Sequence, residues 1–342
     1  MIPRLELAPG YAISRVIKGG WHLGGGHAVV DPARAVRDMA AFVEAGITTF
    51  DCADIYTGVE ELIGRFRRQC PDHARRIRVH TKFVPDLDQL PTVDRAYVER
   101  IVHRSLVRLG MERLDLLQFH WWDYTVPRYV EVALELERLR QAGKIAHLGL
   151  TNFGTDAIRQ IVDAGVPVLT HQLQYSVLDA RPEQGMVDFC RARSIALLCY
   201  GTVAGGFLSE RWLGQPPPPE PLENRSLIKY RLIIEEFGGW LLFQELLAAL
   251  VDVARRYRSD VATVATQVVL DRPGVAAAIV GATSAAHLEA HQRLGTLPID
   301  AGDLARLAVV TDRRRGPLGE VYALERDREG PHGRIMKYNL NG

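Results

Sequence analysis

The chain has 342 residues, 47% of them apolar and 24% charged, with a formal net charge of +1. This length suits one large domain or two ordinary ones. A charge so near zero gives no electrostatic reason to expect nucleic acid or an acidic membrane surface as a partner. The N-terminal segment MIPRLELAPG has no apolar signal core, and no apolar run reaches the ~18 residues of a membrane span. The cysteines are too scattered for a zinc site or a dense disulfide framework, so a reducing cytoplasm is the simplest location; they are Cys52, Cys70, Cys190 and Cys199.

Short apolar or β-branched runs alternate along the chain with longer amphipathic segments. The first amphipathic segment begins with Asp31 as a helix cap and Pro32 in the first turn, and it ends on Gly46. Apolar residues recur at helical spacing in five segments, which predict helices. These segments are 31–46, 97–110, 129–143, 156–165 and 182–194. The eight predicted strands are 15–20, 47–50, 77–82, 115–120, 147–152, 168–173, 196–201 and 276–281.

Eight strands that alternate with helices predict a parallel sheet, and eight such repeats that close on themselves give a (β/α)8 TIM barrel. We expect residues 1–342 to form this single domain. Two segments exceed the barrel. Residues 205–240 contain GQPPPPEP and are expected to form a long inserted loop over one end, and the tail 313–342 is polar and turn-rich. A doubly wound sheet is the rival fold, but its glycine fingerprint is weak, because the helix after GGWHLGGGHAVV begins only at Asp31.

Polar residues stand at the ends of the predicted strands, where TIM barrels build their active sites. Asp51, Asp54 and Tyr56 follow the second strand, Lys82 ends the third strand and His120 ends the fourth. Each residue alone has a structural explanation: an Asp caps a helix, a Lys is solvated and a His is a satisfied core residue. Because the strands end at the same side of the barrel, these residues can meet in one small volume. Their convergence favours a catalytic set.

The chemistry of this set suits proton transfer to an oxygen atom. A tyrosine such as Tyr56 holds its proton at neutral pH, and a nearby lysine lowers the pKa of the phenol and makes it a better acid. A buried Lys82 needs a counter-charge, which Asp51 can supply. A histidine beside the phenol, here His120, can hydrogen-bond a carbonyl oxygen and fix its direction. The set therefore predicts carbonyl reduction by hydride.

In this order, the motifs TTFDCADIYTGVEELIG, HTKF, DLLQFHW, GLTNF, HQLQYSVLD and LLCYGTVAGGFLS resemble the aldo-keto reductases, over roughly residues 15 to 295. The resemblance implies a (β/α)8 barrel that binds a nicotinamide dinucleotide, usually NADP(H). It implies Tyr56 as the general acid, Lys82 and Asp51 as the pair that tunes it, and His120 as the residue that orients the carbonyl. It leaves Asp54 with a role in the local turn.

The same resemblance assigns the cofactor contacts. Asn152 and Gln172 would hydrogen-bond the nicotinamide carboxamide with help from Thr151, and Tyr200 would stack on the nicotinamide ring. The glycines after Tyr200 would let the backbone approach the pyrophosphate closely. The other expected contacts are Gly20, Gly201, Thr202, Gly281, Thr283, Ser284, His287 and His291.

The segment IVGATSAAHLEAH departs from the family at the adenosine end of the cofactor. His287 stands where the family often has Arg, and Gly281 where some members have Lys. Ala290 and His291 replace an acid and an amide. A histidine lacks the permanent charge and the forked donors of an arginine, which weakens the expected preference for NADP(H) and leaves NAD(H) as the alternative. Thr283 and the serine after it could still bind phosphate at the helix start.

Trp21, Trp121 and Trp122, with Tyr124, are candidate pocket walls, although one or two of these rings could equally belong to the core. Aromatic walls suit an apolar aldehyde or the face of a sugar, and the same residues serve reduction or oxidation. Two other functions remain open: a cofactor-binding regulatory subunit like the channel-associated β subunits of this family, and a metal-dependent hydrolase. The hydrolase needs ligand clusters such as HxH at strand ends, which the eleven histidines do not supply, so no metal site is expected. The oligomeric state is open.

Overall fold

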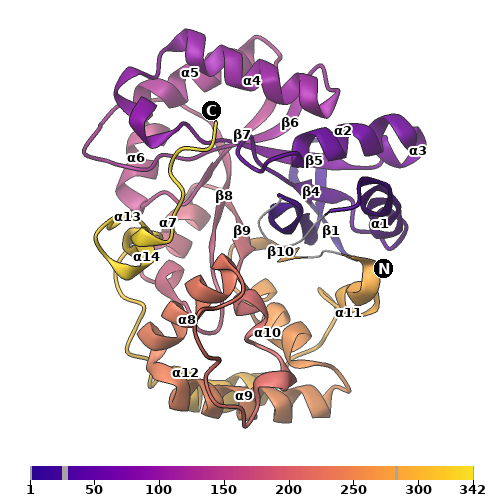
Figure 1. Ribbon diagram of the computed structural model, residues 1–342, viewed down its shortest axis with the longest axis vertical. Coiled ribbons are helices and arrows are strands. Elements are labelled where there is room, and N and C mark those ends of the chain that lie inside the picture. Colours follow the sequence, from indigo (N-terminus) through magenta and orange to yellow (C-terminus); the bar gives the residue numbers. More distant parts are fainter. Residues whose placement is uncertain (1, 25–29, 282–283, 342) are drawn as a thin grey trace.

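The computed structural model describes residues 2–24, 30–281 and 284–341, and these form a closed barrel of eight parallel strands. The strands follow one another around the barrel in chain order, and the last pairs with the first to close the ring. This is the predicted (β/α)8 fold, and each of the eight predicted strands is present (Figure 1). The strands are β3 (Val16–Gly19), β4 (Thr49–Asp51), β5 (Arg78–Phe83), β6 (Leu114–Phe119), β7 (Ile145–Thr151), β8 (Val168–Gln174), β9 (Ala196–Tyr200) and β10 (Val275–Gly281).

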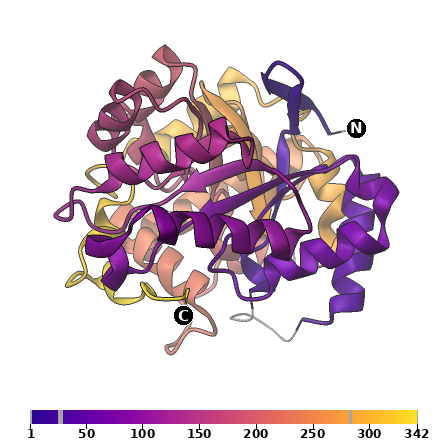
Figure 2. The same cartoon turned by 90° about the horizontal axis from the view of Figure 1, so that it is seen from above.

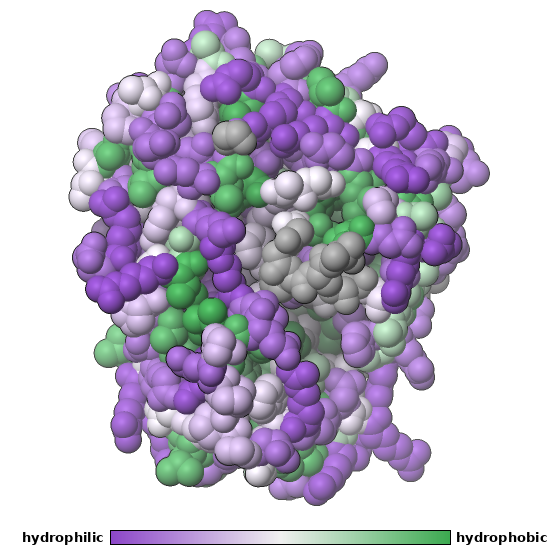
Figure 3. Space-filling view, in the orientation of Figure 1, coloured by the Kyte–Doolittle hydropathy of each residue, from purple (hydrophilic) through white to green (hydrophobic). Residues whose placement is uncertain are grey.

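Helices surround the barrel because each one buries an apolar face. In the first helix, Val36, Met39 and Phe42 recur at helical spacing and are buried. The helices of this layer are α1 (Pro32–Glu44), α2 (Val59–Gln69), α3 (Pro71–Ala74), α4 (Arg95–Leu109), α5 (Tyr129–Gln141), α6 (Thr155–Asp163), α7 (Met186–Ala192), α10 (Val261–Leu270) and α11 (Leu288–Gln292). The five predicted helices correspond to α1 and to α4 through α7. The surface on the face seen in Figure 3 is mostly hydrophilic.

A hairpin that was not predicted covers the N-terminal end of the barrel. Strand β1 (Arg4–Ala8) pairs antiparallel with β2 (Tyr11–Ser14). Tyr11 and Ile13 are buried in one apolar cluster with barrel residues such as Leu116. Figure 2 shows the hairpin and the C-terminal tail on opposite sides of the molecule. The hairpin closes one end of the barrel, so a site has room at the C-terminal ends of the strands.

The prediction of one long loop over residues 205–240 is wrong, because half of this segment is helical. Helix α8 (Arg225–Phe237) begins after Asn224, whose side chain accepts a hydrogen bond from the backbone N–H of Leu227. The apolar residues of α8 and of α9 (Gly239–Arg256) share a core of their own, which stabilises both helices. No single helix in the described ranges is long and apolar enough to cross a membrane; α8 and α9 pass that test only as a pair bent by 94°.

The C-terminal tail returns over the barrel as a strap, defined here as residues 313–341 and drawn in yellow in Figure 1. It follows α12 (Ala301–Thr311) and contains the short helices α13 (Ala323–Arg326) and α14 (Pro331–Arg334). Its end returns to β5, where the Asn341 side chain donates to the carbonyl oxygen of Val84 at 2.6 Å. In its middle, the buried Glu325 accepts from Arg181 at 3.2 Å and lies 3.2 Å from Lys229 Nζ. Buried ion pairs therefore fix the strap to the barrel and to α8.

Replacement of the strap carboxylate should destabilise the fold. Burial opposes ionisation of Glu325, but the charges of Lys229 and Arg181 outweigh it and hold the pKa at about 2. Glu325→Gln leaves two cations without this partner, so we expect a loss of about 3 kcal/mol of unfolding free energy in urea titrations. Arg328→Gln is the control, because it breaks an exposed strap ion pair of 3.5 Å, and it should cost less than about 1 kcal/mol. Equal losses in both variants would contradict the role of burial.

Candidate active site

Lys82 and Asp51 form a buried ion pair at the C-terminal ends of β5 and β4. Lys82 Nζ donates to Asp51 Oδ2 at 2.7 Å and to the carbonyl oxygen of Cys52 at 2.8 Å. The two side chains are only 6% and 5% exposed. Burial disfavours the ammonium, but the negative charge of Asp51 outweighs it and raises the pKa of Lys82 above its usual value. The lysine is therefore a fixed positive charge inside the barrel mouth.

Tyr56 lies directly beside this charge, with its ring centroid 5.0 Å from Lys82 Nζ. Burial raises the pKa of the Tyr56 phenol above its usual value, Lys82 lowers it by less, and Asp51 adds to the rise. The lowering by lysine is present as expected, but the net direction is opposite to the expectation. The reason is that removal of the phenolate from water costs more free energy than its attraction to Lys82 restores, because Lys82 is also paired with Asp51. Tyr56 therefore keeps its proton at neutral pH.

His120 is buried and neutral. Its Nδ1 lies 3.1 Å from the carbonyl oxygen of Thr151, which can only accept, so Nδ1 carries the hydrogen. Burial, with the charge of Arg326 nearby, lowers the pKa of His120 to about 3. Nε2 is then a bare acceptor, and it has no hydrogen-bond partner among the residues that the structure describes. An acceptor at Nε2 can pair with a hydroxyl group, whereas the predicted orientation of a carbonyl oxygen would need a hydrogen on Nε2.

Thr151, Asn152, Gln172 and Tyr200 lie at the ends of three consecutive strands. The Tyr200 hydroxyl donates to Asn152 Oδ1 at 2.8 Å, which leaves the Asn152 amide nitrogen as a donor. Gln172 Nε2 donates to Asp51 Oδ1 at 2.6 Å, which leaves Gln172 Oε1 as an acceptor. The buried hydroxyl of Thr151 has no partner in the described ranges. A carboxamide needs one donor and one acceptor, so these residues fit the nicotinamide group of a dinucleotide.

The predicted cofactor glycines are explained in part by close packing. The backbone N–H of Gly20 donates to the carbonyl oxygen of Asp51 at 2.7 Å, and a Cβ on Gly20 would lie 2.7 Å from the same oxygen. Gly201 has φ +79°, and a Cβ there would overlap a tyrosine hydroxyl. The hydroxyl of Thr202 is 3.0 Å from that of Thr266, so this side chain is held by α10. These positions fix the shape of the barrel mouth.

The expected adenosine end of the site follows β10. Gly281 is exposed, and Ser284 caps a short 3-10 turn that contains the exposed His287. The rings of His287 and His291 are 6.4 Å apart. Burial, then His287, lowers the pKa of His291 to about 4, so His291 is neutral in the physiological range. Thr283 lies outside the described residues.

The three tryptophans have different positions. Trp21 is 36% exposed and meets the Tyr56 ring edge-on at 5.0 Å between centroids. Trp122 is buried with its ring edge-on to His120 at 4.3 Å. Trp121 is 0% exposed and packs in the hydrophobic core. The structure therefore places Trp21 and Trp122 beside the catalytic candidates, whereas Trp121 is a core residue rather than a pocket wall.

Three residues beside the site were not predicted as part of it. Tyr322, from the strap, stands edge-on to His120 at 5.5 Å between ring centroids. Lys229, from α8, places Nζ 5.2 Å from the Tyr200 ring centroid. Gln118, on β6, donates to a carboxylate oxygen of the ion pair at 3.1 Å. Its position at a strand end was the available signal for Gln118, but no periodic pattern marked the strap or placed it over the barrel.

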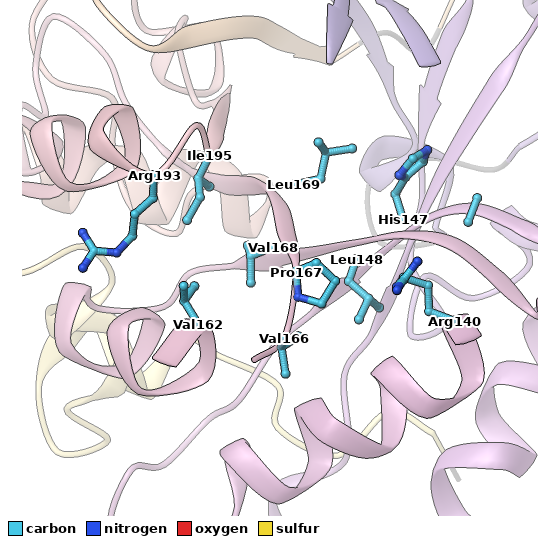
Figure 4. A pocket seen from close by; sticks show the side chains of 11 residues that line it. Arg140, His147, Leu148, Val162, Val166, Pro167, Val168, Leu169, Arg193 and Ile195 are labelled. Atoms are coloured by element: carbon cyan, nitrogen blue, oxygen red, sulfur yellow. The ribbon is translucent and has the colours of Figure 1, made fainter. Parts of the chain in front are cut away.

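A separate hollow of about 380 Å³ lies at the other end of β7 and β8 (Figure 4). Its walls include His147 and Leu148 near the start of β7, and Val168 and Leu169 at the start of β8. None of the predicted site residues lines it. Within the part of the chain with described positions, no group of three or more His, Cys, Asp or Glu residues could hold a metal ion.

Comparison with known proteins identifies the family of this chain. The pattern of the aldo/keto reductase family matches residues 15–311. The chain belongs to the aldo/keto reductase family. It is 26% identical over 333 residues to aldo-keto reductase YhdN of Bacillus subtilis, covering 94% of this chain and 97% of that protein. It is 27% identical over 257 residues to flagellar radial spoke protein 5 of Chlamydomonas reinhardtii, of which it spans 49%.

A solved structure of the glycerol dehydrogenase AKR11B4 from Gluconobacter oxydans has the same fold, with a TM-score of 0.77 and 23% identity. The match covers 93% of this chain and 97% of that chain. Membership in the family makes this protein an NAD(P)H-dependent oxidoreductase. The family fold and the fit of the residues at the barrel mouth agree on a nicotinamide cofactor.

Because His120 is neutral, its imidazole NMR signal should not titrate near neutral pH. Because its pKa is about 3, the imidazole Cε1 proton signal of His120 should not move between pH 8 and pH 5. The signal is assigned by its loss in His120→Asn. A midpoint near the ordinary value of 6.5 would mean that the ring is solvated and that Nε2 is not a fixed acceptor.

Proposed function

We propose that the protein interconverts a carbonyl compound and an alcohol by hydride transfer with NADP(H), and that Tyr56 is the general acid and base. The observation that carries this proposal is the Lys82 ammonium, held by Asp51 and placed 5.0 Å from the Tyr56 ring. A partly buried phenol beside a fixed cation can lose its proton when the reaction requires it and regain it afterwards. A buried ion pair at this position gives no stability that well-packed apolar side chains would not also give, so its presence favours a catalytic role.

The side chains divide the chemistry between them. When bound, a reduced nicotinamide held by Asn152, Gln172 and Tyr200 would supply a hydride to the carbonyl carbon of the substrate. Tyr56 donates its phenolic proton to the carbonyl oxygen as that C–H bond forms, and Lys82 stabilises the phenolate that remains. Asp51 keeps Lys82 in place. In the oxidative direction Tyr56 takes the proton from the alcohol, while His120 Nε2 accepts from a substrate hydroxyl.

The surroundings of His120 favour a substrate that carries hydroxyl groups. Nε2 of His120 offers an acceptor, which a simple aldehyde has no donor to match. Trp122 and Tyr322 lie edge-on to His120, and Trp21 lies edge-on to Tyr56. Aromatic rings pack well against the C–H face of a sugar. A sugar or another hydroxycarbonyl compound is therefore the proposed substrate class, ahead of an apolar aldehyde. The four cysteines are free thiols, which supports a cytoplasmic location as part of the proposal.

Tyr56→Phe tests the proton-transfer role. The ring packing survives this change, but the proton donor is lost, so kcat should fall by ~10²-fold or more while the dissociation constant for NADPH changes little. Turnover is followed by NADPH absorbance over a panel of sugars and aldehydes, in both reaction directions. Tyr129→Phe is the control, since it removes a hydroxyl that donates to Gln160 at 2.7 Å on the outer helices. Near wild-type turnover by Tyr56→Phe would refute the role, and an inactive wild type would favour a cofactor-binding regulatory subunit.

His287→Arg tests the cofactor preference. We propose that the exposed His287 faces the 2′-phosphate of NADP(H), where a histidine lacks the permanent charge and the forked donors of an arginine. His287→Arg should therefore raise NADPH affinity by roughly tenfold to hundredfold and leave NADH affinity little changed. Dissociation constants for both cofactors measure this. His103→Arg, an exposed change on α4, is the control; an unchanged NADPH affinity in His287→Arg would place another residue at the phosphate.

A further inference from the structure

A hydrogen-bonded trio of buried side chains, defined here as Asp51, Gln118 and Gln172, lies beside Lys82. Gln118 Nε2 donates to Asp51 Oδ1 at 3.1 Å, and Gln172 Nε2 donates to the same oxygen at 2.6 Å. Gln172 Nε2 also donates to Gln118 Oε1 at 3.1 Å. Lys82 occupies the other carboxylate oxygen, Oδ2, at 2.7 Å. Both oxygens of Asp51 are therefore fixed by side chains from three different strands.

The trio determines which way both amides face. Gln172 has two N–H groups on its amide nitrogen, and both are used within the trio, so Gln172 can present only its oxygen to a bound carboxamide. Gln118 donates to the carboxylate and accepts from Gln172, so both polar atoms of Gln118 have a partner. A flipped Gln118 amide would place its oxygen against Asp51 and break both contacts.

The buried position of Gln118 requires hydrogen-bond partners as well as volume. Gln118 is 0% exposed and stands beside Lys82 in the β5–β6 register. Two residues earlier on the same strand, Leu116 fills the barrel interior with an apolar side chain. A buried amide is costly unless it is hydrogen-bonded, and its bond to a charged carboxylate is among the stronger ones. Position 118 therefore requires an amide, whereas position 116 in the layer below requires only an apolar side chain of suitable size.

We propose that Gln118 is a positioning residue, which holds Asp51 in line with Lys82 and holds the Gln172 amide with its oxygen toward the nicotinamide carboxamide. This inference rests on the proposed function for its catalytic consequence. The hydrogen bonds to Asp51 Oδ1 keep the carboxylate from rotating, so that Oδ2 stays on the lysine that supports Tyr56. Both polar atoms of Gln118 are used within the trio, so Gln118 acts through Asp51 and Gln172.

Gln118→Glu gives a test that depends on pH. A protonated glutamic acid reproduces the amide, because its O–H donates to Asp51 and its carbonyl oxygen accepts from Gln172. Its ionised form has no donor and faces the carboxylate of Asp51, which is repulsive. We expect kcat relative to wild type to be nearly normal at pH 5 and to fall by about tenfold to hundredfold by pH 8. Gln118→Met, which lacks both polar groups, should lose kcat to a similar extent at both pH values.

A stability readout in the same experiment does not depend on activity. The introduced carboxyl should have a raised pKa in the fold, so its protonated form is favoured and stability is lost as pH rises above the unfolded value of about 4.3. The thermal midpoint of Gln118→Glu relative to wild type should therefore be lower at pH 8 than at pH 5, by about 3 °C or more. Gln267→Glu is the matched control. Gln267 is also buried and donates to an aspartate, Asp271, at 2.8 Å, but it lies on α10, so its relative kcat should be the same at both pH values.

The outcomes separate the two proposals. A midpoint that falls with pH while kcat stays at the wild-type level would overturn the positioning role and leave the proposed function intact. A midpoint with no pH dependence relative to wild type would overturn the contact with Asp51 itself. If the wild type turns over no carbonyl compound, the proposed function fails and the catalytic part of this inference fails with it, whereas the stability measurement still decides the contact.

Discussion

The site depends on one buried charge, the ammonium of Lys82. Removal of a charge from water costs several kcal/mol unless a partner and further hydrogen bonds compensate it. Asp51 provides the partner at 2.7 Å and the carbonyl oxygen of Cys52 a second acceptor at 2.8 Å. Adjacent parallel strands set this geometry, because the ends of β4 and β5 lie side by side. Once the pair is fixed, the phenol of Tyr56 lies beside a positive charge that cannot move away.

Burial has opposite effects on the two proton-bearing groups near this charge. The pKa of Tyr56 is raised by burial, which keeps the phenol protonated, and that of His120 is lowered by burial, which keeps the imidazole neutral. Both effects follow from the cost of a charge in a medium that water does not reach. The result is a donor and an acceptor with fixed roles over a wide pH range. The proposed proton transfer to one oxygen would need such a fixed asymmetry.

The enclosure that causes this burial comes from segments that are remote in the chain. Glu325 joins the strap to Arg181 and to Lys229 of α8, and the same strap brings Tyr322 against His120. The barrel supplies the reactive groups, and the strap and α8 help to exclude water from them. The stability of the strap and the properties of the site are thus coupled through one buried carboxylate.

The sequence was enough to predict the eight strands, the (β/α)8 fold and the positions of Asp51, Tyr56, Lys82 and His120 at the strand ends, because hydrophobic periodicity and strand-end chemistry are local signals. It did not predict α8, because the proline-rich run before this helix indicated a loop. It also did not predict that Trp121 lies in the core. The direction of the Tyr56 pKa became visible only in the folded structure, as did the hydrogen on His120 Nδ1 and the trio around Asp51. These depend on burial and on contacts between residues distant in sequence, and a pattern along one chain carries no information on which side chains exclude water from which others.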